Sequence, residues 1–408
     1  MAKPKRLQAA SGMKELMLRH FRAGWLAREE GRKVAYITSG GPVEFLHAMD
    51  VVPVYPENHG AVCGVARAGG RLSQAAEEKG YSRDLCSYWK IDWGARIRPA
   101  ESPIGGLPAP DFLLCANNIC RTVVKWFEGL SRFYRIPLLA LDLPFRHSGE
   151  VPAAREYVRG QFRRLPEELS RVTGTKWNEE KFRESVALSR QASALWQECI
   201  DANAARPAPS SAADQFLLMG PIVTMRGTTE AVEFYRGLRD EIRERVRAGE
   251  GAVEGETVRI LWDNLPVWHK LRYVSDLLAD RGAVLVGATY TNAWTESPME
   301  SPSVMEAVAD AYARIWLNMG LRHREKVIRE MAEFLSADGV IFHANRSCKP
   351  YSFGQEEIAA RLQADGVPCI LVEGDMADER DFSGGAWGTR LEAFIERLDN
   401  RTGAGREE

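Results

Sequence analysis

Residues 339–348 read Gly-Val-Ile-Phe-His-Ala-Asn-Arg-Ser-Cys, an apolar run that ends in polar residues and a thiol. A short apolar run of this kind is typical of a buried β-strand. In open α/β sheets the ligand sites lie at the carboxyl ends of the strands. The stretch therefore predicts a buried strand whose end presents the Cys348 thiol at the edge of a sheet.

The segments on either side of this stretch repeat the same alternation of strand and helix. Helix-like segments separate short apolar runs, which predicts parallel sheets covered by helices on both faces. In the C-terminal part the strand-like runs are 258–262, 284–288, 340–342 and 367–372. In the N-terminal part they are 34–38, 51–55, 111–115 and 136–142. We expect an α/β fold with two doubly wound parallel-sheet lobes of similar plan.

The strand signals vanish in the middle of the chain. Between about 151 and 255 the apolar residues recur at helical spacing among many Arg and Glu, which is typical of amphipathic helices. This pattern predicts a helical insert between the two lobes. The expected units are an N-terminal α/β lobe over 1–150, a helical module over 151–255 and a C-terminal α/β lobe over 256–408.

The overall composition is that of an ordinary globular protein. The chain has 408 residues, 27% of them charged, and a formal net charge of −2. This charge gives no reason to expect nucleic acid or an anionic membrane as a partner. No apolar run reaches the roughly 20 residues that span a bilayer, and the basic N-terminus has no apolar stretch behind it. The seven cysteines are too few, and odd in number, for a disulfide scaffold. We expect a cytoplasmic protein with reduced thiols.

Three of the cysteines have similar polar surroundings. Cys86, Cys120 and Cys348 each follow a strand-like run or stand at the expected start of a helix. Thiolates are soft, anionic ligands that suit iron, so these residues are candidate ligands of an iron–sulfur cluster. A fourth ligand could be water, a hydroxyl, a substrate atom or Cys115. The spacing alone does not decide between this site and buried structural cysteines, because the chain has no CxxC pair. The remaining cysteines lie in more apolar surroundings and are predicted core residues: Cys63, Cys199 and Cys369.

A second group of candidates follows the strand-like run 51–55. The segment 55–60 is an expected loop that contains Glu57 and His59, either of which could move protons at the edge of the sheet. The alternatives are that Glu57 caps the next helix and that His59 is a surface residue. The glycine-rich turn 39–42 matches neither a dinucleotide fingerprint nor a P-loop. Any ATP that the protein needs must therefore be used by another chain.

The cysteine motifs carry a family resemblance. Residues 80–88 read Gly-Tyr-Ser-Arg-Asp-Leu-Cys-Ser-Tyr, residues 118–120 read Asn-Ile-Cys, and residues 345–352 read Asn-Arg-Ser-Cys-Lys-Pro-Tyr-Ser. With 378–383 and 389–394, they resemble the iron–sulfur subunits of 2-hydroxyacyl-CoA dehydratases and ATP-dependent (class I) benzoyl-CoA reductases. The Asn-Arg-Ser-Cys-Lys context and the chain length are most similar to the smaller benzoyl-CoA reductase subunit.

The resemblance implies an activity and a set of partners. Cys86, Cys120 and Cys348 become the ligands of a cluster of the [4Fe-4S] type, with Glu57 and His59 as candidate proton relays. The implied partners are a related cluster-bearing subunit, in a heterodimer, and an ATP-hydrolysing iron–sulfur activator. The predicted enzyme is an oxidoreductase, a benzoyl-CoA reductase that passes low-potential electrons to the ring of an aromatic acyl-CoA. The alternatives are a subunit of a 2-hydroxyacyl-CoA dehydratase and a non-catalytic subunit that only carries electrons.

Overall fold

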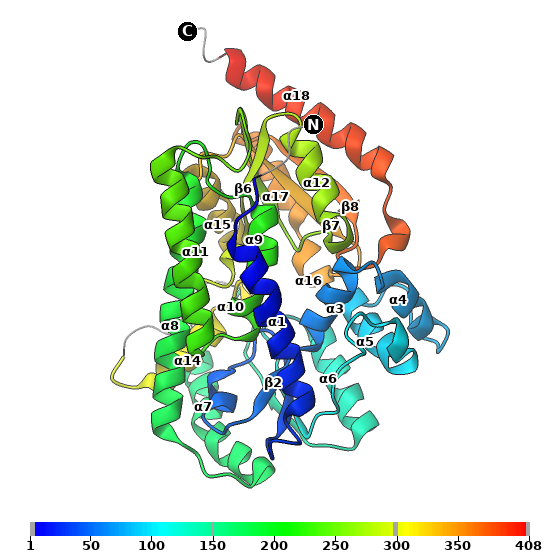
Figure 1. Ribbon diagram of the computed structural model, residues 1–408, viewed down its shortest axis with the longest axis vertical. Coiled ribbons are helices and arrows are strands. Elements are labelled where there is room, and N and C mark those ends of the chain that lie inside the picture. Colours follow the sequence, from blue (N-terminus) through cyan, green and yellow to red (C-terminus); the bar gives the residue numbers. More distant parts are fainter. Residues whose placement is uncertain (1–4, 148–150, 297–300, 405–408) are drawn as a thin grey trace.

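Two four-stranded parallel sheets form the framework of the protein (Figure 1). The structure is a computed structural model that describes residues 5–147, 151–296 and 301–404, with side chains to residue 400. The N-terminal sheet has the order β2-β1-β3-β4 and the C-terminal sheet the order β6-β5-β7-β8. The strands are β1 Val34–Ile37, β2 Val52–Val54, β3 Phe112–Ala116, β4 Leu138–Leu141, β5 Val258–Asp263, β6 Ala283–Ala288, β7 Gly339–Asn345 and β8 Cys369–Gly374. The predicted α/β fold with two parallel-sheet lobes is confirmed.

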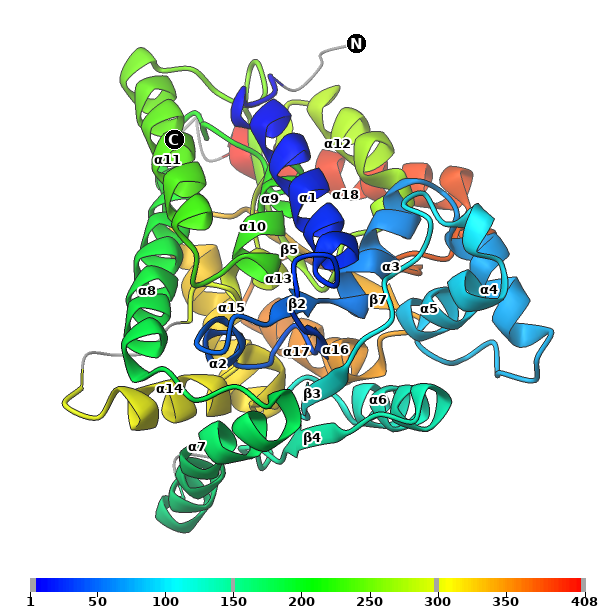
Figure 2. The same ribbon diagram turned by 60° about the horizontal axis from the view of Figure 1, so that its bottom comes forward.

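Helices cover both faces of the N-terminal sheet. Alternate residues of its central strands face opposite sides, as the pleat of a strand requires. Leu113 belongs to the core that includes Ile91 and Phe127, whereas Leu114 belongs to the core that includes Phe45 and Phe162. Figure 2 shows the strands between α2 and α7 on one side and α5 and α6 on the other. The helices of this lobe are α2 Glu44–His47, α3 Pro56–Val65, α4 Gly69–Glu77, α5 Ser87–Ile97 and α6 Arg121–Tyr134.

The middle of the chain is helical, as predicted. No strand lies between β4 and β5 in the residues described there. The two long helices α8 and α11 run alongside both sheets in Figure 1, and α8 buries the stripe formed by Phe182, Val186, Trp196 and Ile200. The helices are α7 Pro152–Thr173, α8 Glu179–Asp201, α9 Ala212–Leu218, α10 Gly220–Thr224 and α11 Thr229–Ala248, and α1 Ala9–Leu26 packs against the last three. The division into three domains stays a prediction.

The C-terminal lobe repeats the plan of the first. Short helices follow β6 and β7, and longer ones pack on the sheet. Between β6 and β7 the two helices α14 and α15 are separated by a short 3₁₀ turn, Trp316–Asn318. The helices are α12 Leu271–Ala279, α13 Thr289–Asn292, α14 Val304–Ala313, α15 Leu321–Phe334, α16 Lys349–Ser352, α17 Gln355–Ala364 and α18 Gly384–Ala404.

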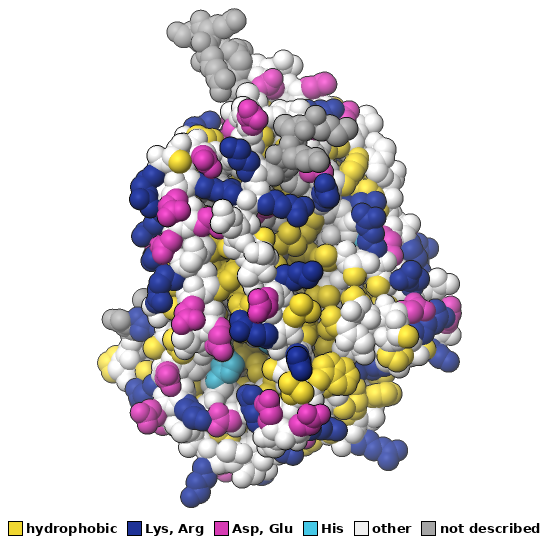
Figure 3. All heavy atoms as spheres, in the orientation of Figure 1, with side chains coloured by type: hydrophobic (Ala, Val, Ile, Leu, Met, Phe, Trp, Pro, Cys, Tyr) yellow, Lys and Arg dark blue, Asp and Glu magenta, His cyan; other side chains and the backbone are white. Residues whose placement is uncertain are grey.

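The face shown in Figure 3 has no large patch of only basic or only acidic side chains. Basic and acidic side chains are interspersed there, and hydrophobic side chains gather in a central band. This distribution agrees with the formal net charge of −2. Among the described residues, no helix is both long and apolar enough to cross a membrane.

Candidate functional site

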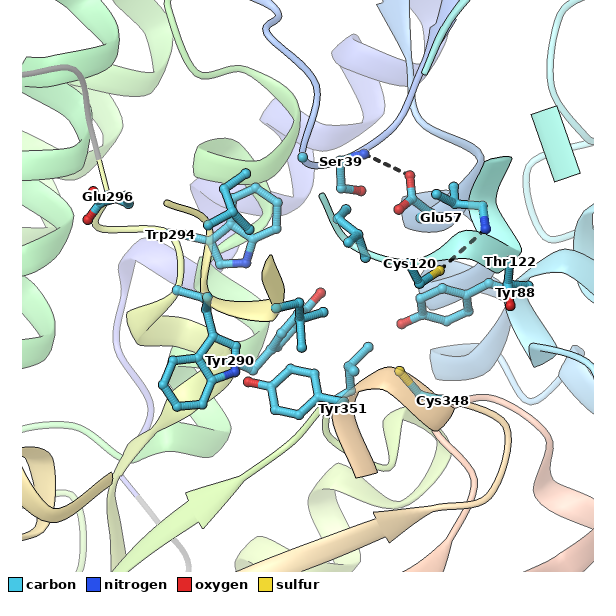
Figure 4. Close-up of a pocket in the computed structure, with 18 of the residues that line it drawn as sticks. Ser39, Glu57, Tyr88, Cys120, Thr122, Tyr290, Trp294, Glu296, Cys348 and Tyr351 are labelled. Atoms are coloured by element: carbon cyan, nitrogen blue, oxygen red, sulfur yellow. Dashed lines mark hydrogen bonds between the residues drawn. The ribbon is translucent and has the colours of Figure 1, made fainter. Parts of the chain in front are cut away.

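A cavity lies between the two lobes. Its lining comes from all three segments of the chain, with Cys120 from the N-terminal lobe, Arg226 from the helical segment and Cys348 from the C-terminal lobe. Figure 4 shows Cys120 and Cys348 on the same side of the cavity, with Trp294 across from them. The lobe junction at the carboxyl ends of two parallel sheets is where ligand sites form in such folds.

Two of the predicted thiols occupy matching places in the two lobes. Cys120 is the N-cap of α6 and follows β3, while Cys348 is the N-cap of α16 and follows β7. The Val123 amide donates a hydrogen bond to Cys120 Sγ at 3.3 Å, which stabilises the helix start and fixes the sulfur. The prediction that the β7 stretch ends at a thiol on the sheet edge is confirmed.

The third thiol comes from an insertion in the first lobe. Cys86 is the N-cap of α5, and it lines the same cavity as the other two. Hydrogen bonds from the C-terminal lobe fix the positions of Ser87 and Tyr88, which follow Cys86. Ser347 Oγ donates a hydrogen bond to Ser87 Oγ at 3.1 Å, and Trp268 Nε1 donates one to the Tyr88 hydroxyl. The fold therefore brings together three thiols that are far apart in sequence.

Burial disfavours the ionised forms of the three thiols. Burial raises the pKa of Cys120 to about 11 and that of Cys348 to about 12, and it raises the pKa of Cys86 well above its ordinary value. The neighbouring thiols add to the shift at Cys86, because one thiolate disfavours another. Without a cation these groups stay protonated at neutral pH. A metal would ionise them, as thiolate ligands require.

The three thiols are ligands of the kind that an iron–sulfur cluster takes. In the described part of the chain, no three His, Cys, Asp or Glu side chains lie close enough to share one metal ion. In a four-iron cluster each thiolate binds a different iron, so its ligands stand further apart than the ligands of one ion. Three soft thiols that face one largely apolar cavity have the chemistry that such a cluster needs.

A carboxyl group and a serine lie beside the thiols. The backbone N–H of Ser39, at the end of β1, donates a hydrogen bond to Glu57 Oε2 at 2.7 Å, and both residues line the cavity (Figure 4). Burial raises the pKa of Glu57 to about 7, although the Ser39 hydrogen bond opposes the shift. Glu57 is therefore a group that can give up a proton near neutral pH.

His59 faces away from this cavity. The expected loop over 55–60 is instead the start of α3, because Pro56 stands at a first-turn position that proline favours. Side chains two residues apart on a helix do not share a face. His59 is fully buried, so the surface alternative is wrong, and its Nε2 contacts Ser102 Oγ at 2.9 Å. Burial lowers the pKa of His59 to about 4.

Several other residues near the thiols are part of the core. Cys115 lies within β3 and belongs to the buried cluster, not to the cavity lining. Trp89 and Trp93 pack on Tyr81. Trp126, in contrast, forms part of the cavity wall, where its indole N–H donates to the buried Asp92 at 2.8 Å.

Sequence reasoning missed a polar network in the cavity wall. Arg226, Glu44 and Tyr312 come from three different segments and all line the cavity. The Arg226 guanidinium lies 3.5 Å from Glu44 Oε1 and donates to the Tyr312 hydroxyl at 2.6 Å. No sequence signal marks these residues, because they lie far apart in the chain and share no motif. Only the packing of the three segments brings them together.

Comparison with known proteins places the chain in a family. The family model of the D-component of 2-hydroxyglutaryl-CoA dehydratase matches residues 38–398. The chain belongs to this family. The match spans both lobes and the helical segment, and it includes all three thiols of the cavity. The resemblance noted in the sequence is confirmed at this level.

Similar proteins include both activities that the sequence analysis considered. The alpha subunit of (R)-2-hydroxyisocaproyl-CoA dehydratase from Clostridioides difficile is 32% identical over 95% of each chain. The alpha subunit of (R)-phenyllactyl-CoA dehydratase from Clostridium sporogenes is 32% identical over 91% of this chain and 90% of its own. A benzoyl-CoA reductase subunit from Thauera aromatica is 31% identical over 92% of this chain and 91% of its own. Each of these relatives is one subunit of a larger enzyme.

Proposed function

We propose that this chain is the cluster-bearing, substrate-binding subunit of an enzyme that dehydrates a 2-hydroxyacyl-CoA. The observation that carries the proposal is the presence of three thiols and a protonatable carboxyl, Glu57, in the wall of one largely apolar cavity. The dehydratase alpha subunits among the relatives support it.

The site residues would divide the work as follows. Cys86, Cys120 and Cys348 would hold an iron–sulfur cluster, which supplies one electron at low potential to the thioester when bound. Dehydration breaks the bond between C2 and the hydroxyl oxygen and removes a proton from C3. The oxygen leaves as water only if it gains a proton. The reaction is redox-neutral, so the electron is recovered at the end of each turnover.

Glu57 is the group in the cavity that suits this proton transfer. With its pKa raised to about 7, a large share of Glu57 is protonated at neutral pH. The Ser39 N–H holds one oxygen of the carboxyl, which orients the other. An oriented acid whose pKa is near the working pH is an efficient proton donor. The proton-relay role of His59 stays a prediction, and its contacts with Ser102 and Cys63 do not lead to the cavity.

Ring reduction of an aromatic acyl-CoA is the second candidate, and it is the reaction that the sequence analysis favoured. The aromatic side chains of Trp126, Tyr290 and Trp294 in the cavity wall favour a flat substrate, because aromatic rings stack on one another. The relationship to a benzoyl-CoA reductase subunit supports it as well. In that reaction the electrons are consumed, and Glu57 would protonate the ring.

Both reactions require partners. We propose a heterodimer with a related cluster-bearing subunit and a separate ATP-hydrolysing activator, because no phosphate-binding glycine motif was found in this chain. The reduced thiols and the low-potential chemistry favour the cytoplasm. The alternative of a non-catalytic electron carrier does not explain why an aromatic-lined cavity with a carboxyl group, Glu57, lies beside the thiols.

The experiment that tests the proposal counts electrons. The reconstituted complex is given ATP, a low-potential reductant and either a 2-hydroxyacyl-CoA or benzoyl-CoA. A dehydratase forms many molecules of 2-enoyl-CoA for each electron supplied, whereas a ring reductase consumes two electrons for each dienoyl-CoA. Turnover of benzoyl-CoA alone would contradict the dehydratase and establish the second candidate. If neither thioester reacts although the cluster is reduced and reoxidised, the electron-carrier alternative is correct.

A further inference from the structure

The charged side chains around the cavity are mostly acidic. Glu44, Glu57 and Glu296 line it, and Arg226 is the one cation that lines it in the described part of the chain. Arg226 and Glu44 are both buried, whereas Glu296 pairs with Arg314 at 2.8 Å. Figure 4 shows Glu296 well away from Cys120 and Cys348. Arg226 is therefore the residue whose positive charge could pair with an anionic acyl group deep in the cavity.

Arg226 is already engaged by an anionic partner and by a hydroxyl group. Its Nε lies 3.5 Å from Glu44 Oε1, and its Nη2 donates to the Tyr312 hydroxyl at 2.6 Å. The guanidinium also lies over two aromatic rings, with its central carbon 5.3 Å from the Tyr312 ring centre and 5.9 Å from that of Trp294. A cation that is paired and stacked in this way has little charge left to offer a ligand.

Glu44 is held in the position that neutralises Arg226. Ser189 donates a hydrogen bond to Glu44 Oε1 at 2.6 Å, and Tyr312 donates one to Oε2 at 2.8 Å. These hydroxyls come from α8 and α14, so two other segments fix a carboxylate of α2. A single charge buried without a partner would be strongly unfavourable, which explains why Glu44 and Arg226 are buried as a pair.

We propose that the acyl site selects uncharged, aliphatic or aromatic acyl groups and rejects those that bear a carboxylate, with Glu44 as the specificity-determining residue. This inference rests on the proposed function. A carboxylate on the acyl group would be buried near Glu44, and the one cation that lines the cavity in the described part of the chain is already paired with Glu44. An uncharged group would instead contact the aromatic and aliphatic walls formed by residues such as Trp126, Tyr290 and Ile315.

Two non-reactive thioesters of nearly equal shape test this selectivity in the wild-type complex. The acyl chain of 4-methylpentanoyl-CoA ends in an isopropyl group, and that of succinyl-CoA ends in a carboxylate at the same position. Calorimetry on the anaerobically purified complex should show that 4-methylpentanoyl-CoA binds at least about 100-fold more tightly, the scale expected for an uncompensated buried charge. Neither ligand carries a 2-hydroxyl, so the measurement is independent of turnover.

Removing the charge of Glu44 should change the ratio of the two affinities, that for 4-methylpentanoyl-CoA over that for succinyl-CoA. In Glu44→Gln the side chain keeps its shape and Arg226 becomes an unneutralised cation. We expect succinyl-CoA to bind about tenfold more tightly than to the wild type, and 4-methylpentanoyl-CoA to change by less than about threefold. The matched control is Glu256→Gln. It removes the negative charge of another buried ion pair, Glu256 with Arg259, and neither residue lines the cavity. This control should leave the ratio unchanged.

The outcomes distinguish a failure of the acyl selectivity from a failure of the proposed function. Equal binding of the two thioesters to the wild type would overturn the inference and leave the proposed function standing. Failure of both thioesters to bind would overturn the proposed function and the inference together. A Glu44→Gln protein that keeps the wild-type ratio would show that Glu44 does not set the selectivity. The wild-type ratio needs no variant, so it decides the main point even if Glu44→Gln does not fold.

Discussion

The two sheets have the same strand order, yet they supply different chemistry to the cavity between them. In each lobe the third strand is followed by a thiol at the start of a helix, Cys120 after β3 and Cys348 after β7. The first two strands of the lobes differ. In the N-terminal lobe β1 is followed by Ser39 and β2 by Glu57, and both residues are polar.

In the C-terminal lobe the corresponding places are not ionisable near neutral pH. Leu265 follows β5 and Tyr290 follows β6, and both line the cavity. The connection between the second and third strands also differs, since it carries Cys86 in the first lobe and the aromatic residues Tyr312 and Trp316 in the second. One architecture, used twice, therefore places a carboxyl group on one side of the cavity and a mainly apolar wall on the other.

The largest expected effect comes from removing either of the matching thiols. Cys120→Ala or Cys348→Ala should lose most of this chain's share of the iron in the anaerobically purified complex, because each thiol would bind its own corner of the cluster. The control is Cys369→Ala, a buried cysteine in β8 that does not line the cavity. Iron and sulfide analysis measures the loss. Full iron content in both variants would show that the matching positions are only structural.

The next largest effect, on kcat, should distinguish the residues that follow the second strand of each lobe, Glu57 after β2 and Tyr290 after β6. Glu57→Gln should lower kcat by about 100-fold, the usual contribution of a positioned acid, while Tyr290→Phe should lower it by less than about tenfold. Burial raises the pKa of Glu57 to about 7, and only the protonated form donates. Wild-type activity should therefore fall as the pH rises above about 7. Glu57→Gln should lose this dependence in a pH profile of kcat, and an unchanged profile would contradict the assignment.

Much of this arrangement could be predicted from the sequence, and the reasons are local. Apolar runs followed by polar residues indicated the strands, and helix starts after two of them placed Cys120 and Cys348 at the sheet edges. Cys86 was different, because it follows a helix and not a strand. Its assignment depended on the motif around it and on the family resemblance.

The rest depended on long-range packing that local patterns do not encode. The contact of Ser39 with Glu57 exists because β1 and β2 are neighbours in the sheet, and strand order cannot be read from the sequence. The separation of Glu57 from His59 follows from the helix that begins at Pro56, where a loop was expected. The pairing of Glu44 with Arg226 spans 182 positions and three packed segments.

The smallest expected effect concerns the ion pairs that join the lobes beside the thiols. Asp381 accepts from Arg83 of the N-terminal lobe at 2.5 Å and from Arg346 of the C-terminal lobe. These side chains are partly exposed, so Asp381→Asn should cost no more than about 1 kcal/mol in the free energy of unfolding. Denaturant unfolding at low and high salt measures this. A loss of several kcal/mol would show that the lobes depend on this contact far more than on the buried junction.

The central claim is that thiols from both lobes hold one cluster beside the acyl cavity. Anomalous X-ray scattering at the iron edge, from anaerobic crystals of the complex with 4-methylpentanoyl-CoA, tests it most directly. The account predicts one iron–sulfur centre in this chain, bounded by Cys86, Cys120 and Cys348, with the acyl group in the cavity next to Glu57. An iron peak at other residues of this chain, a zinc signal in its place, or an acyl group bound away from the cavity would contradict it.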